Sequence, residues 1–131
     1  MNRQILLCAI DALKEAFEHR SRPTHVRVVG VPGDVALLQI DKDFGSLTRE
    51  EMSYQNASMM VLDSTLIVPE AFWYFFPRIA ELILLENGDY YMLTIRLEEL
   101  GDYGLNSKEI LVKNELVRLL EKLEQELNEA T

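Results

Sequence analysis

Residues 68–77 read VPEAFWYFFP and place five aromatic side chains in succession between two prolines. On a helix, the apolar positions spaced three and four apart fall in one arc, and this arc continues past Pro77. The arc consists of Phe72, Phe75, Phe76, Ile79, Leu82 and Ile83. The pattern therefore predicts one helix over residues 69–86, bent at Pro77, with its phenylalanines in the core.

The proline inside this helix weakens it, and the aromatic side chains compensate. Pro77 has no N–H to donate to the carbonyl of Trp73 and its ring crowds that oxygen, which costs about 3 kcal/mol in a helix interior. Burying one Phe side chain contributes roughly 1.5 to 3 kcal/mol, so three of them outweigh the bend. Trp73 and Tyr74 point off the main arc. We expect these two side chains to be exposed and to anchor an interface with another protein.

The rest of the chain favours a mainly α, single compact domain spanning residues 1–131. Four further helices are predicted, each from an amphipathic pattern or a capping signal: residues 3–20, residues 34–44 capped by Asp34, a helix from Thr48 with Glu51 completing a capping box, and residues 107–128 capped by Ser107. Residues 90–97 fit a strand by alternation and a helix by spacing. A small sheet from residues 25–31 and 90–97, which makes the fold α+β, is therefore left open.

The charge of the chain restricts its partners. The formal net charge is −9, which repels nucleic acid and anionic membranes alike. Up to Gly33 the chain has five basic and three acidic residues, a balance of +2, and from Asp34 onward it has eight basic and nineteen acidic residues, a balance of −11. We therefore expect a basic protein partner, with no nucleic acid and no membrane.

The N-terminal residues and the cysteine content predict a cytoplasmic protein. The apolar run at residues 5–10 is too short for an export signal and is followed at once by Asp11 and Lys14 at helical spacing. A single cysteine, Cys8, excludes an internal disulfide and fits a reducing compartment.

The residues that could support catalysis or hold a metal are few. Asp41 and Asp43 are spaced as in a calcium loop, but Gly45 comes one place early and Met52 stands where a bidentate Glu is needed. His19 and His25 lack a metal-ligand partner at suitable spacing. On one helix Cys8 and His19 are about 16 Å apart, too far for a nucleophile and its base. We expect no catalytic residue, no cofactor and no metal, so an enzyme is the less favoured reading.

Several short motifs resemble those of a known family. They are AFEHRSRP at the end of the first helix, DFG before a short helix, and the PEAFWYFFP helix. With the closing amphipathic helix, they make the chain similar to an uncharacterised family of small bacterial proteins. That family has no established activity, so the resemblance implies a mostly helical fold and assigns no catalytic residue. In size and charge the chain also resembles the immunity proteins that neutralise secreted bacterial toxins.

These observations predict a protein-binding domain, most concretely an immunity-type inhibitor whose acidic surface covers the basic site of a toxin. The residues expected to contact the partner are Trp73, Tyr74, Glu98, Glu99, Asp102 and Tyr103. The alternative is a structural or homo-oligomeric subunit of a larger assembly, with a homodimer formed through the narrow leucine stripe of the C-terminal helix.

Overall fold

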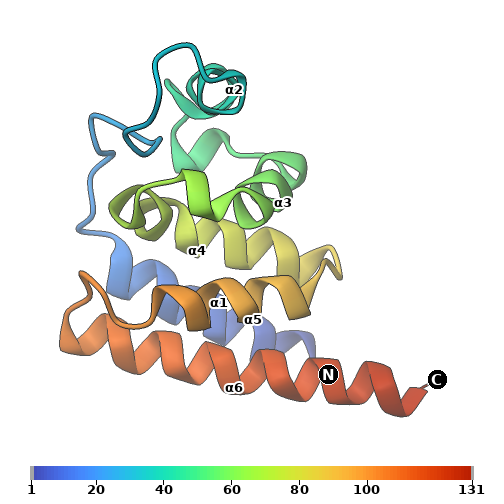
Figure 1. The fold of residues 1–131 in the computed structure, drawn as a ribbon. Coiled ribbons are helices and arrows are strands. Elements are labelled where there is room, and N and C mark those ends of the chain that lie inside the picture. The colour runs from blue at the N-terminus through green and yellow to red at the C-terminus, as the bar shows by residue number, and fades with distance from the viewer. Residues whose placement is uncertain (1, 131) are drawn as a thin grey trace.

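Helix α4 (Pro69–Leu85) is the central element of the chain, whose computed structural model describes residues 2–130. Its N-terminus carries Pro69 in the first turn, where a missing N–H costs nothing. The helix runs through Pro77 without interruption, as predicted, and Phe72, Phe75 and Phe76 are buried in the core. In Figure 1 α4 lies in the middle of the molecule, with other helices on both sides.

The other elements surround α4 (Figure 1). They are α1 (Arg3–Phe17), α2 (Val35–Phe44), the 3-10 turn η1 (Arg49–Glu51), α3 (Tyr54–Leu62), the 3-10 turn η2 (Ser64–Leu66), α5 (Tyr90–Leu100) and α6 (Ser107–Ala130). α1, α3, α5 and η1 all pack directly on α4, and α6 packs on α1 and α5. The prediction of a mainly α fold is therefore confirmed, and one cluster of buried apolar side chains spans all six helices.

The expectation of a small sheet is wrong. Residues 90–97 lie in α5, and residues 25–31 pair with the chain only at one isolated antiparallel bridge between Arg27 and Ile67. The helical form of α5 is favoured because Asp89 caps it by accepting from the Met92 amide, and because Leu93 and Leu97, one turn apart, are both buried.

The helix expected from Thr48 is interrupted. Thr48 and Glu51 do form the predicted capping box, but it begins only the short turn η1. Met52 then adopts an extended backbone and buries its side chain, and α3 begins with a second capping box between Ser53 and Asn56. The sequence signal for a helix start was correct, and tertiary burial of Met52 decided how far that helix extends.

The leucine stripe of α6 is covered within the chain. Leu116, Leu120 and Leu123 are buried where α6 packs on α1 and α5, and only Leu127 of the stripe remains well exposed, at 57%. The stripe does not present an apolar face to a second copy of the protein.

Candidate functional site

The connection between α5 and α6 is a short loop that depends on two glycines. Gly101 ends α5 with φ 58° and ψ −136°, and Gly104 has φ 74°. Side chains with a Cβ rarely adopt such positive φ values, so glycine is required at both positions. Between them Asp102 and Tyr103 form the outermost part of the loop. We call the surface made by Glu98, Glu99, Asp102 and Tyr103 the acidic corner.

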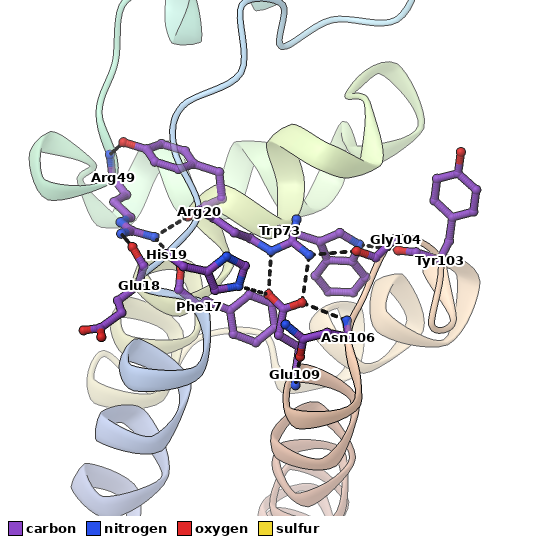
Figure 2. Close-up of polar contacts among 11 residues, drawn as sticks. Phe17, Glu18, His19, Arg20, Arg49, Trp73, Tyr103, Gly104, Asn106 and Glu109 are labelled. Carbon is purple, nitrogen blue, oxygen red and sulfur yellow. Dashed lines mark hydrogen bonds and ion pairs between the residues drawn. The ribbon is translucent and has the colours of Figure 1, made fainter.

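Three side chains from different parts of the fold hold the backbone of this loop from the inside. The Trp73 indole N–H of α4 donates to the Tyr103 carbonyl at 2.9 Å. Arg20, just after α1, donates from Nη2 to the Gly104 carbonyl at 2.8 Å. Lys113 of α6 donates to the Gly101 carbonyl at 2.7 Å and pairs with the Asp102 carboxylate. Figure 2 shows Trp73 and Arg20 pointing at the loop from the interior.

Beneath the loop a buried ion pair joins the end of α1 to the start of α6. Glu109 is 0% exposed and receives two hydrogen bonds from Arg20, from Nε at 2.5 Å and from Nη2 at 2.9 Å. His19 Nε2 lies 3.2 Å from the same carboxylate. Asn106 and Glu109 also cap each other, amide to side chain, at 3.0 and 2.8 Å. Asn106 therefore caps α6 in place of the expected Ser107.

The protonation of Glu109 follows from these contacts. Burial raises the pKa of Glu109, but the hydrogen bonds from Arg20 and the Asn106 amide outweigh it and hold that pKa below its usual value. The carboxylate is therefore charged at neutral pH, and both of its oxygens accept hydrogen bonds from within the fold. We assign the Arg20–Glu109 pair a positioning role, because it fixes the base of the loop and reaches no open surface.

The side chains of the acidic corner point outward. Tyr103 is 73% exposed, and Figure 2 shows its ring directed away from the Glu109 cluster. Glu98, Glu99 and Asp102 are exposed as well. Glu99 accepts a hydrogen bond from Arg96 at 2.6 Å, and Asp102 is paired with Lys113. The four residues expected at this surface are thus exposed together, on one helix end and the loop that follows it.

The negative charge extends from the acidic corner along α6. Burial raises the pKa of Glu124, and the charges of Asp89, Glu121 and Glu98 raise it further. Glu98 is thus one of three carboxylates whose charge acts on Glu124 of α6. A basic molecule is attracted to this side of the protein.

The other two expected contact residues are not exposed, and their assignment as exposed anchors was wrong. Trp73 is 0% exposed and packs against the rings of Phe17, Phe72 and Phe76. Tyr74 is 6% exposed, because η1 covers it: the Arg49 amide donates to its hydroxyl and the Arg49 guanidinium lies 5.0 Å from the centre of its ring. A helical projection assumes one free face, whereas α4 is enclosed on several sides.

The remaining polar features do not assemble a catalytic or metal site. Cys8 is exposed on α1, while His25 lines a groove beside α2 whose lining does not include Cys8. A groove of about 440 Å³ contains Lys14, Arg78 and Glu81, but Glu81 pairs with both cations at 2.6 Å. Within residues 2–130 no group of three His, Cys, Asp or Glu side chains could hold a metal ion, and no helix is long and apolar enough to cross a membrane.

Comparison with known proteins adds no relative: no family model, no curated protein and no solved structure matches this chain. The resemblance to a family of small bacterial proteins therefore stays a prediction.

Proposed function

We propose that this protein binds another protein through the acidic corner. The observation that carries the proposal is Tyr103, which is 73% exposed although its backbone carbonyl is held from inside by Trp73 at 2.9 Å. An exposed tyrosine on a loop without internal contacts is common and carries little information. Here side chains from three separate parts of the fold, Arg20, Trp73 and Lys113, restrain the loop, and the restraint supports a contact surface.

The restraint matters energetically. Ordering a mobile loop on binding opposes association, whereas a loop that is already ordered presents its side chains without that cost. A tyrosine at the centre of an interface contributes about 2 kcal/mol or more when its ring is covered by the partner. The exposed carboxylates of Glu98, Glu99 and Asp102 precede Tyr103 closely in the chain and favour positive charge on the opposing surface.

The most concrete version of this function is an immunity-type inhibitor that covers the basic site of a toxin. It is supported by the net charge of −9, by the carboxylates around Glu98 and by the small size of the chain. The acidic corner fits the role because an inhibitor needs no catalytic group, only a rigid surface of opposite charge. The partner to test is a basic toxin, and the neighbouring gene is the first place to look for one.

The test compares charge reversals that change the net charge equally. The double variant Glu98→Lys, Glu99→Lys alters the acidic corner. The double variant Asp11→Lys, Glu86→Lys alters exposed carboxylates on α1 and at the C-terminal end of α4. Tyr103→Ala removes the exposed ring.

Affinity is measured by calorimetry with the purified neighbouring toxin at low and high salt, and protection by growth of cells that express it. We expect the reversal at Glu98 and Glu99 and the Tyr103 variant each to weaken binding about tenfold or more, and the control reversal to change it far less. Binding that is indifferent to Glu98 and Glu99 rejects the acidic corner as the site. Absence of any complex, with unprotected cells, rejects the immunity role.

A further inference from the structure

The opposite end of the molecule carries an exposed apolar surface. Val29 is 99% exposed, Val31 74%, Val35 79% and Leu38 53%, and together they come from the segment before α2 and from α2 itself. Monomeric proteins scatter single apolar residues over their surface but seldom gather several large ones at one place. We call the surface of these four side chains the valine patch.

The valine patch borders a groove of about 470 Å³ between residues 28–33 and α2. Gly30 lies directly against α2, since a Cβ added there would meet Leu37 Cδ1 at 2.3 Å. On either side of Gly30, Val29 and Val31 are largely exposed, so neither side chain is packed against α2. The segment is thus seated on α2 through its glycine and displays its valines outward.

The same segment has an unpaired backbone edge. The Val28 amide donates to Leu66 at 2.9 Å and the Val68 amide donates to Val26 at 2.8 Å, and the pairing ends there. Along a strand the amides of alternate residues face opposite sides, so those of Arg27 and Val29 face away from residues 66–68. Within the described chain neither amide donates to another backbone group. An unpaired edge of this kind accepts another extended segment.

Charge decides which molecule fits this surface. Residues 20–43 contain four basic and three acidic residues, a balance of +1 against −9 for the whole chain. Arg27 is paired with Asp41 at 2.6 Å, and Asp34 is used in capping α2. Asp43 accepts from Gln39 at 2.9 Å, and its other oxygen is buried. This surface therefore offers a basic partner little negative charge, whereas a second copy of the chain meets its least repulsive surface. The second copy also brings an identical apolar segment with an identical unpaired edge.

We propose that two copies of this chain form a twofold symmetric dimer in which residues 27–31 pair antiparallel with their counterparts, centred on Val29. Each Val29 amide then donates to the Val29 carbonyl of the other copy, and the valine patches cover each other. A twofold axis makes one patch sufficient for both partners. Figure 1 places α2 at the top of the molecule and α5 and α6 at the bottom, so the dimer leaves both acidic corners free.

Sedimentation equilibrium over a range of concentrations tests the dimer. The variant Val29→Asp, Val31→Asp puts carboxylates on side chains that contribute nothing to the core, so its fold, checked by circular dichroism, is unchanged. Leu127→Asp is the control, because it places a single carboxylate on an exposed leucine of α6. We expect the wild type and Leu127→Asp to dimerise alike, and the valine variant to dissociate with a constant at least about tenfold higher.

Two results overturn the proposal. One is a wild-type chain that stays monomeric at the highest concentration reached, and the other is a dimer lost in Leu127→Asp but kept in the valine variant. Hydrogen exchange gives a second readout that does not depend on variants. The amides of Arg27 and Val29 become protected as the concentration rises if the edges pair, and exchange that is equally fast at every concentration contradicts that pairing.

Discussion

Replacing Glu109 with glutamine tests whether the buried ion pair holds the base of the loop. The carboxylate accepts from Arg20 at 2.5 and 2.9 Å and from the Asn106 amide at 3.0 Å. A glutamine has one acceptor oxygen and an NH₂ group, so at least one of these donors must face another donor. Arg20 also loses the opposite charge that compensates its removal from water.

The size of the effect follows from the burial of both partners. Removing one partner of a buried ion pair costs about 3 to 5 kcal/mol. The Arg20 side chain is 15% exposed and keeps the Gly104 carbonyl as an acceptor, which lowers the loss. We therefore expect Glu109→Gln to reduce the free energy of unfolding by about 2 to 4 kcal/mol. That is a large part of the roughly 5 to 15 kcal/mol that stabilises a domain.

Urea unfolding followed by tryptophan fluorescence measures the loss, because the single tryptophan, Trp73, is buried beside this cluster. Glu15→Gln is the control: Glu15 pairs with Lys108 at 3.2 Å, but both side chains are well exposed. The control is expected to change the free energy of unfolding by less than about 1 kcal/mol. If Glu109→Gln is no more destabilising than Glu15→Gln, the ion pair does not hold the loop.

Three further predictions concern the paired carboxylates and the loop between α5 and α6. In the folded chain the pKa values of Glu81 and Glu109 are lowered from 4.5, because hydrogen bonds to their cationic partners outweigh the effect of burial. The two carboxylates therefore stabilise the folded state above pH 4.5, and this contribution is lost as the pH falls through their folded pKa values. The urea midpoint must then fall below pH 4.5, and a flat profile there contradicts this. Gly101→Ala, at φ 58°, should cost about 1 to 3 kcal/mol in urea unfolding, and an equally stable variant shows that the loop relaxes freely. Trp73→Phe removes the donor to Tyr103 and should speed amide exchange in the loop, whereas unchanged exchange means that the other two restraints suffice.

The sequence predicted helices and buried residues best where an apolar pattern extends over several turns of one helix. The arc of phenylalanines in α4 and the apolar stripe of α6 both repeat over several turns, and both helices are present with the phenylalanines and the central leucines Leu116, Leu120 and Leu123 buried. Residues 90–97 were undecidable by periodicity, because Leu93 and Leu97 satisfy the helical and the alternating pattern at once. Besides the Asp89 cap, a contact with another helix stabilises α5: Arg96 donates to the carbonyls of Val61 and Leu62 at the end of α3.

The burial of Trp73 could not be predicted from its own helix. Its N–H is satisfied by a carbonyl 30 residues further along, and Glu109 meets Arg20 across 89 residues. One local signal was present, since Asn106 and Glu109 have the spacing of a capping box. This spacing indicated that Glu109 points back at the loop. It did not indicate that Arg20, just after α1, pairs with Glu109.

The placement of the arginines affects the charge of the protein surface. Several arginines do not face solvent but donate to the exposed carbonyls at the ends of helices. Arg49 reaches Phe17 and Glu18 at the end of α1, Arg22 reaches Phe44 at the end of α2, and Arg96 reaches Val61 and Leu62 at the end of α3. A cation at a helix C-terminus is stabilised by the unpaired carbonyls there.

This use of arginine links the fold to the proposed binding surface. An arginine that donates to backbone carbonyls, as Arg22 does, contributes less to neutralising the surface carboxylates, whereas Arg96 and Lys113 also pair with Glu99 and Asp102 and partly neutralise the acidic corner. At the acidic corner Arg20 and Lys113 likewise donate to backbone carbonyls of the loop, while Glu98 and Tyr103 remain exposed. Arg20 and Lys113 thus make the loop rigid and, because they point inward, leave Glu98 as negative charge on the outer surface. A rigid loop and a negative surface both favour the binding of a basic partner.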